Sequence, residues 1–307
     1  MFSLSLIELL NIQVTSVSKT PEKVSEAAAA IHVITGEDIR RFGVTSIPEA
    51  LRLAPGMNVA RFNANQWAIS SRGFNDLFAN KLLVLIDGRS VYSPLFAGVY
   101  WDVQDTMLED IERIEVIRGP GATLWGSTAV NGVINVITKS AKNTQGGLVT
   151  AGAGTEEVGF GSFRFGGKIG KNVAIRGYAK YFERDDQALA HGNDAADEWR
   201  MGRGGFRLDW DASPVDLVTF QGDLYGGAVG DRTGAPLLTP PFSRQVTGHG
   251  DVAGGNVMGR WSHDFTKNSK MQLQVYYDRS ERVKVGFHRG ERVDTVDLDF
   301  QHQFAFG

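Results

Sequence analysis

RGPGATLWGSTAVNGVINVITK, residues 118–139, is the stretch of sequence that decides the fold. Gly119 and Pro120 predict a turn, because glycine permits positive φ angles and proline fixes its own. The other glycines of the stretch let backbones approach each other where no side chain would fit. Residues 132–138 are almost uncharged and rich in β-branched side chains, which predicts a strand. The alternating run IERIEVIR, residues 111–118, predicts a second strand just before the turn.

A phosphate-binding loop is the alternative interpretation of these closely spaced glycines. Such loops end in GK[ST] and open a helix. This stretch contains no GK[ST], and we expect no helix after it, so the turn-and-strand interpretation is preferred.

Residues 118–139 closely resemble the last conserved block of the plug domain of TonB-dependent outer-membrane receptors. Three further stretches resemble plug blocks in the same order and spacing: VITGEDIRRFGVTSIPEALRLAPGMNV (residues 33–59), ISSRGF (69–74) and LLVLIDGRSVY (82–92). Four motifs in order are far more specific than one, and they cover roughly the first 140 residues. The remainder resembles the opening strands of that family's barrel, in pattern more than in motif.

Composition restricts the class of protein. The net charge of −3 gives no case for nucleic-acid binding, and the chain has 37 Gly and no Cys. Without cysteine, disulfides and thiolate metal sites are excluded. The longest apolar runs are far shorter than the ~20 residues of a membrane helix, whereas barrel strands alternate. The start, MFSLSLIELL, lacks the features of a signal peptide, so we expect the signal peptide to be missing from this chain.

Two helices are predicted in the first half. Thr35 is a suitable N-cap with Asp38 at the capping-box position, and Gly43 supplies the stop. Ser46 opens the second helix, with Pro48 in its first turn and Glu49 completing a capping box.

Strands complete this α+β domain, at residues 67–72, 82–86, 90–92, 111–117 and 132–138, with a hairpin at Asp87 and Gly88. His32 is interpreted as a structural strand residue. We find no catalytic grouping and no metal site, and we expect neither enzymatic activity nor a cofactor.

Transmembrane β-barrel strands are predicted in the second half, because apolar residues recur at every second position. The clearest runs are VAIRGYAKY, FRLDWD, MQLQVYYD and VDLDFQHQF, which begin at residues 173, 206, 271 and 296. A soluble β-sandwich alternates too, but strand lengths near the ~9–11 residues that cross a bilayer favour the barrel. The polar residues 184–198 and 230–250 are predicted to be long external loops.

We expect the barrel to be incomplete. The pattern gives about eight strands, whereas plugged outer-membrane transporters have about 22, and an eight-stranded barrel is filled by its own side chains. The fold prediction is therefore an α+β plug domain followed by antiparallel transmembrane β-barrel strands of an incomplete 22-stranded barrel. Its domains are an N-terminal segment (1–20), the plug (21–140) and the first part of the barrel (145–307). Phe306 is interpreted as an ordinary outward-facing residue.

The resemblance implies an energy-coupling segment before the plug, the TonB box. The candidate is IQVTSV: Ile12, Gln13, Val14, Thr15, Ser16 and Val17. Its alternating, β-prone sequence suits the addition of a strand to another protein's sheet edge. The alternative is that it forms the first strand of the plug.

The resemblance also implies plug arginines that engage glutamates of the barrel wall. Arg72 and Arg118 occupy the matching positions, and a guanidinium suits the role because its planar fork binds carboxylates in a bidentate way. Alternatively, either arginine braces its own turn.

Ligands of the family rest on plug loops, which here match residues 61–66, 74–80 and 92–101. The predicted ligand-contacting residues are Arg61, Asn63, Gln66, Phe74, Asn75, Phe96, Tyr100 and Trp101. Exposed aromatic side chains on loops offer a large apolar area for binding. The alternative is that they pack against the barrel wall.

The function implied is uptake of a scarce nutrient across the outer membrane of a Gram-negative bacterium, driven by TonB with ExbB–ExbD in the periplasm. An iron–siderophore complex is the first expectation for the ligand; cobalamin, haem and glycan receptors share these blocks. We expect a monomer that contacts outer-membrane lipid and lipopolysaccharide. Three alternatives are disfavoured. A signal-transducing receptor usually has an additional N-terminal domain, which we do not find here, and a passive porin lacks a plug of this kind. An envelope hydrolase would need a catalytic grouping, which is missing.

Overall fold

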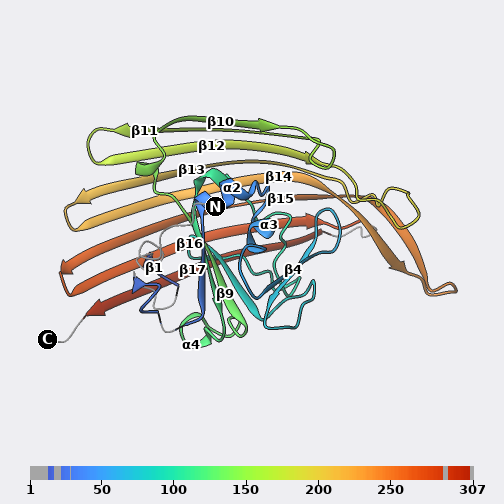
Figure 1. The fold of residues 1–307 in the computed structure, drawn as a ribbon, viewed down its shortest axis with the longest axis horizontal. Coiled ribbons are helices and arrows are strands. Elements are labelled where there is room, and N and C mark those ends of the chain that lie inside the picture. The colour runs from blue at the N-terminus through green and yellow to red at the C-terminus, as the bar shows by residue number, and fades with distance from the viewer. Residues whose placement is uncertain (1–12, 17–21, 28, 286–289, 305–307) are drawn as a thin grey trace. The chain divides into compact units, whose positions relative to one another are not determined.

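The computed structural model describes residues 13–16, 22–27, 29–285 and 290–304 (Figure 1). Internal contacts divide the chain into two units. The first comprises residues 1–62 and 66–138, and the second comprises residues 63–65 and 139–307. Among the described residues, no helix is long and apolar enough to cross a membrane.

Five strands form the central sheet of the first unit, in the order β3-β8-β9-β6-β7. They are β3 (Ile31–Thr35), β8 (Ile111–Arg118), β9 (Gly132–Thr138), β6 (Leu82–Ile86) and β7 (Arg89–Ser90). β6 runs parallel to β9, and the other neighbours are antiparallel. Ile114, Val116, Ile134 and Val136 have no exposed surface. β9 is thus buried on both faces, which explains why its sequence carries no charge.

The remaining strands of this unit form two small antiparallel pairs. β4 (Met57–Arg61) pairs with β5 (Trp67–Ser71). β1 (Gln13–Val14) pairs with β2 (Glu22–Lys23).

The first predicted helix is confirmed as α2 (Gly36–Phe42). The Thr35 hydroxyl accepts from Asp38 N at 3.1 Å, and the Asp38 carboxylate accepts from Thr35 N at 2.9 Å. Both bonds of the capping box are therefore present. Gly43 ends the helix with a left-handed backbone, at φ 62°.

The second predicted helix, α3 (Ile47–Leu51), forms, but only half of its predicted capping box does. The Ser46 hydroxyl accepts from Glu49 N at 3.4 Å. The Glu49 carboxylate instead accepts hydrogen bonds from Arg52 Nε at 2.6 Å and Trp67 Nε1 at 3.2 Å. A tertiary contact therefore replaces the predicted local bond.

The hairpin at residues 87–88 is confirmed. Asp87 and Gly88 have φ angles of 51° and 83°, which suit the tight two-residue turn between β6 and β7. The buried Asp87 carboxylate also accepts from Thr138 N and Thr138 Oγ1, both at 2.8 Å. The same residue thus makes the turn and holds the end of β9.

Other local expectations are wrong. Residues 122–125 form a short helix, α4, within the glycine-rich stretch, because Gly121 O accepts from Leu124 N and Trp125 N. A single 3₁₀ turn, η1 (Leu108–Asp110), precedes β8. β5 and β7 are shorter than predicted, ending at Ser71 and Ser90.

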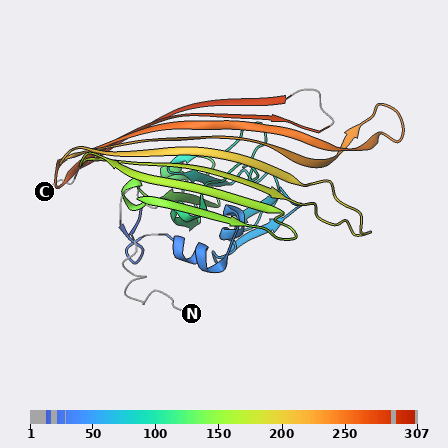
Figure 2. The ribbon, with the colours of Figure 1, turned by 90° about the horizontal axis from the view of Figure 1, so that it is seen from above.

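Eight antiparallel strands form the sheet of the second unit, side by side in chain order from β10 to β17 (Figures 1 and 2). A 3₁₀ turn, η2 (Ala141–Asn143), precedes them. They are β10 (Gly146–Gly152), β11 (Gly159–Ile169), β12 (Val173–Arg184), β13 (Trp199–Ser213), β14 (Asp216–Pro236), β15 (Ser243–Thr266), β16 (Ser269–Val283) and β17 (Gly290–Phe304). Among the described residues β10 and β17 are the two edges, so the predicted eight strands are confirmed and the sheet is open.

One of the two predicted external loops is wrong. Residues 185–198 do connect β12 to β13, but residues 230–250 are mostly strand. β14 and β15 pair continuously to Pro236 and Ser243, so that only residues 237–242 form the connection. Cross-strand backbone bonds outweigh the polar composition of this hairpin. Phe306 lies outside the described residues.

One face of this sheet is apolar. Cross-strand partners share a face, and one such row runs Leu208, Phe220, Gly259, Val275 and Leu298. Neighbouring rows add Phe163, Phe165, Phe206 and Val257, and most of these side chains are exposed. The opposite face carries residues such as Arg207, Asp209, Thr219, Gln221 and Gln274. This alternation is the predicted barrel pattern.

Candidate functional site

The predicted TonB box is folded onto the first unit, as far as it is described. Gln13 and Val14 form β1, and Val14 is fully buried. Thr15 and Ser16 follow, while Ile12 and Val17 lie outside the described residues. The described part is therefore strand and turn, and it does not extend freely from the unit.

Ser16 makes contacts through all of its polar groups. Ser16 N and Ser16 Oγ donate to Glu115 Oε2 at 2.8 and 2.5 Å. Asn135 Nδ2 donates to Ser16 Oγ at 3.0 Å, and Trp125 Nε1 donates to Ser16 O at 2.7 Å. Residues of β8, β9 and α4 thus converge on one serine.

Each of the two predicted locking arginines packs its guanidinium group against a glycine. A Cβ atom at Gly119 would lie 3.3–3.4 Å from the Nη2, Cζ and Nη1 atoms of Arg72. A Cβ atom at Gly56 would lie 2.9 Å from Arg118 Nη1. Both guanidinium groups therefore rest against glycines, where no side chain interferes.

The positive charge of Arg118 acts on the neighbouring His32. Burial, and next the positive charge of Arg118, lower the pKa of His32, while Asp38 acts in the opposite direction. Within the described part of the chain, Arg118 Nε is buried without a hydrogen-bond partner. His32 itself lies in β3, as a strand residue, in agreement with its sequence interpretation.

The predicted ligand loops differ in exposure. Phe74 is 82% exposed, and its backbone is left-handed at φ 55°. The Phe96 ring stacks on Tyr100 at 4.1 Å and tilts against Phe78 at 5.1 Å. Asn75 Oδ1 is buried without a hydrogen-bond partner among the described residues. Phe74 and the Phe78–Phe96–Tyr100 cluster are the aromatic surface of these loops.

The expected exposure of Trp101 is wrong. Trp101 is buried, at 7% exposed, so it does not belong to the exposed aromatic surface. The Arg61 guanidinium lies 5.6 Å from the ring centre of Trp67, and Gln66 O accepts from Phe62 N at 2.8 Å. Arg61 and Gln66 therefore help to form the β4–β5 connection.

Residues 63–65 belong by their contacts to the second unit. Ala64 N donates to Asp197 Oδ2 at 2.7 Å. Asn65 Nδ2 donates to Asp197 O and to Gly230 O, both at 2.8 Å. Ala64, Asn65 and Asp197 are all buried.

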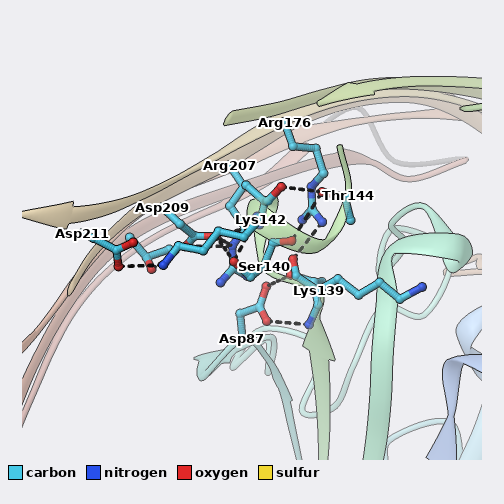
Figure 3. Close-up of polar contacts among 12 residues, drawn as sticks. Asp87, Lys139, Ser140, Lys142, Thr144, Arg176, Arg207, Asp209 and Asp211 are labelled. Atoms are coloured by element: carbon cyan, nitrogen blue, oxygen red, sulfur yellow. Dashed lines mark hydrogen bonds and ion pairs between the residues drawn. The ribbon is translucent and has the colours of Figure 1, made fainter. Parts of the chain in front are cut away.

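A polar cluster at the start of the second unit was missed by sequence reasoning (Figure 3). Ser140 Oγ and Ala141 N donate to Asp209 Oδ2 at 2.7 Å, and Thr219 Oγ1 donates to Asp209 Oδ1 at 2.8 Å. Lys142 Nζ pairs with Asp211 at 2.6 Å. The available signal was the pair of aspartates at alternate positions on the polar face of β13.

No group of three or more His, Asp or Glu side chains in the described ranges could hold a metal ion. The site is thus a set of surfaces and hydrogen bonds, and the described residues offer no metal centre.

A family model for the TonB-dependent receptor plug domain matches residues 23–133. Residues 23–133 therefore belong to this plug-domain family. The first unit of the chain contains the matched plug residues apart from 63–65, and the second unit has an antiparallel sheet that resembles the start of the family's barrel. The predicted fold class is confirmed on both points.

Two curated relatives show how far the similarity extends. The chain is 34% identical over 145 residues to the vitamin B12 transporter BtuB of Vibrio vulnificus, covering 47% of this chain and 23% of the relative. It is 28% identical over 326 residues to a ferric enterobactin receptor of Pseudomonas aeruginosa, covering 90% and 42%. The chain thus spans less than half the length of these TonB-dependent receptors.

The fold also matches solved structures. The structure of P. aeruginosa FpvA in complex with a heterologous ferric pyoverdine superposes with a TM-score of 0.71 at 16% identity. The match covers 96% of this chain and 42% of that one. At this identity the match supports the fold alone.

Proposed function

We propose that the whole protein is a TonB-dependent transporter of the bacterial outer membrane, which takes up a scarce nutrient with energy supplied from the periplasm. The observation that carries this proposal is the direct succession of a plug domain and an antiparallel sheet with one apolar face. A passive porin has no use for such a plug, and no catalytic grouping among the described residues favours an enzyme.

The apolar face supports a location in the outer membrane. Side chains such as Val149, Phe163, Leu224 and Leu298 are more than half exposed, although they are large and apolar. Water is an unfavourable surrounding for such a continuous face, whereas lipid chains suit it. Lipid and lipopolysaccharide are therefore the proposed neighbours of this face.

An iron–siderophore complex is the proposed ligand. The alignment with a ferric enterobactin receptor covers 90% of the chain, which is why this class comes first. The aromatic cluster of Phe78, Phe96 and Tyr100, with the exposed Phe74, would offer a contact area for an organic chelate. Arg61, Asn63, Gln66 and Asn75 stay as predicted loop contacts, with Asn63 assigned to the second unit.

Cobalamin is the second candidate, because the relative with 34% identity is a vitamin B12 transporter. Haem or a glycan as ligand, or signal transduction, would be alternative outcomes of the same experiment.

Residues 12–17 are the proposed contact for TonB, which acts with ExbB–ExbD. Arg72 and Arg118 are the proposed plug residues that engage carboxylates of the barrel wall. Supporting this second role, Arg118 Nε is buried and unpaired among the described residues, and a buried N–H group needs an acceptor.

The test uses the full-length gene in a strain that lacks it. Uptake of labelled ferric siderophores and labelled cobalamin is measured with and without TonB. TonB-dependent uptake of one ferric siderophore is the expected result. Equal uptake in both backgrounds would refute energy coupling, and uptake of cobalamin alone would establish the second candidate. Pull-down with the C-terminal domain of TonB provides independent evidence of coupling.

A further inference from the structure

Glu115 is the main residue that binds Ser16 to the central sheet of the plug. Glu115 lies in β8 between β3 and β9, and its side chain has no exposed surface. Its Oε2 atom accepts from Thr15 N at 3.0 Å and from Ser16 N at 2.8 Å, in addition to the Ser16 hydroxyl. Its Oε1 atom accepts from Arg113 Nε at 2.8 Å.

This arrangement satisfies a buried charge almost entirely. A carboxylate out of water is stable when cations and N–H or O–H donors surround it. Arg113 supplies the positive charge, and the remaining donors come from Thr15 and Ser16. If this segment leaves, the Glu115 carboxylate loses the N–H and O–H donors of both Thr15 and Ser16, so the segment and Glu115 stabilise each other.

The same backbone groups are needed for strand addition. A segment that joins another protein's sheet edge pairs through its backbone N–H and C=O groups. Here the N–H groups of Thr15 and Ser16 are donated to Glu115, and Ser16 O accepts from Trp125. A partner strand cannot use these groups while the Glu115 contacts persist.

We propose that Glu115 holds the coupling segment on the plug, and that TonB and Glu115 compete for the backbone of Thr15 and Ser16. This rests on the proposed function of residues 12–17. Glu115 is a positioning residue, which acts through the segment that it retains. Its loss exposes the segment and strengthens binding of the partner.

Glu115→Gln tests this at constant side-chain size. A carboxylate only accepts hydrogen bonds, whereas an amide carries an NH₂ group. In one orientation that NH₂ faces Arg113 Nε, and in the other it faces the N–H groups of Thr15 and Ser16. Either orientation places donor against donor, so the variant weakens the contact without opening a cavity.

Because the chain has no cysteine, a single introduced cysteine is the one thiol in this chain that a maleimide can label. Val14→Cys places a single thiol at a fully buried position beside Thr15. In the full-length receptor in detergent, Glu115→Gln is expected to accelerate maleimide labelling of this thiol by about tenfold or more, since hydrogen bonds to a charged group are the strong ones. Glu112→Gln is the matched control, because exposed Glu112 pairs with the same Arg113; it should leave the rate unchanged.

Two further variants protect the interpretation. Ser16→Ala removes one donor from the segment and leaves the sheet intact, so it should accelerate labelling of the Val14→Cys thiol to a smaller degree than Glu115→Gln. If Glu115→Gln does not fold, Ser16→Ala tests the proposal in its place. A thiol at Ile39, buried in α2, reports general unfolding and should stay unreactive. Unchanged Val14→Cys labelling in Ser16→Ala and Glu115→Gln would overturn the proposal, as would equal acceleration at Ile39.

Binding of the TonB C-terminal domain is measured on the same variants without the reporter. Tighter binding to Glu115→Gln than to Glu112→Gln supports competition. Faster labelling with unchanged affinity would overturn it. If the TonB domain binds no variant, the coupling function itself fails, while labelling still decides whether Glu115 holds the segment.

Discussion

The guanidinium group of Arg72 lies face-on against Gly119, the residue that follows Arg118. Three of its atoms are equally distant, 3.3–3.4 Å, from the position that a Cβ of Gly119 would take. Arg72 itself has a left-handed backbone, at φ 59°, which is uncommon for a residue with a side chain. A positive side chain thus packs on the turn that follows Arg118, and its own backbone is strained.

Replacement of Arg118 should loosen the plug more than it weakens ligand binding. In the full-length receptor, Arg118→Ala would leave the proposed barrel carboxylates unpaired, at about 3–5 kcal/mol if they are buried. Limited proteolysis of the plug and ligand affinity are the two measurements. Arg52→Ala, which removes an exposed arginine paired with Glu49, is the control. Equal protease resistance of Arg118→Ala and wild type would contradict the locking role.

Gly56 should be needed for the placement of Arg118. Gly56→Ala puts a Cβ 2.9 Å from Arg118 Nη1 at a φ of 79°, so it combines crowding with backbone strain. Gly43→Ala, at φ 62° with nothing within 4 Å, carries only the strain, about 1 kcal/mol. Proteolysis should therefore affect Gly56→Ala more than Gly43→Ala. Equal protease sensitivity of the two variants would show that Arg118 moves aside freely.

Proline at position 14 should uncouple uptake from binding. Val14→Pro removes a backbone donor and disrupts strand addition. In the full-length receptor we expect uptake to be abolished and ligand binding to persist. Binding assays on whole cells under de-energised conditions separate the two. Val14→Ala, which keeps the donor, is the control, and normal uptake by Val14→Pro would refute the assignment of the box.

The plug should be soluble when expressed alone. Residues 11–140 lack the lipid-facing alternation of the second half, and the central strand β9 of their sheet is buried on both faces. Purification without detergent and a single cooperative unfolding transition are the expected results. Recovery only in detergent would argue against a plug.

Acid should destabilise this isolated plug through His32. Its pKa in the folded state lies below the unfolded value of about 6.5, so the unfolded chain binds more protons between the two values. Stability from neutral His32 is therefore complete above this window and is lost as the pH falls through it. Urea unfolding at about pH 7.5 and 5.5 should show a larger loss for wild type than for His32→Gln. Equal losses would mean that burial and Arg118 do not act on His32 as described.

Local signals in the sequence were reliable where one segment decides its own structure. Thr35, Asp38 and Gly43 bound α2 as predicted, because caps involve only near neighbours. The Asp87–Gly88 turn and β9 were predictable for the same reason. The alternation of the second half gave eight strands, since each strand's own sequence distinguishes its two faces.

Non-local contacts could not be predicted in this way. In the sequence, Glu115 is one charged position in an alternating strand. Ser16 lies 99 residues away in the chain, and only the fold brings it to Glu115. Trp101 has the sequence context of an exposed loop aromatic, yet it is buried in the fold. The failure at residues 230–250 is similar, because the partner strand decides whether a polar segment is a loop.

Asn65 illustrates what such contacts mean for selection experiments. Both of its amide hydrogens are committed to backbone oxygens, at Asp197 and Gly230. In a library selected for growth on altered chelates, substitutions at Phe74 should shift which compounds are used. Substitutions at Asn65 should instead vanish from every selected pool alike, so that its depletion records abundance of the receptor and carries no information on ligand preference.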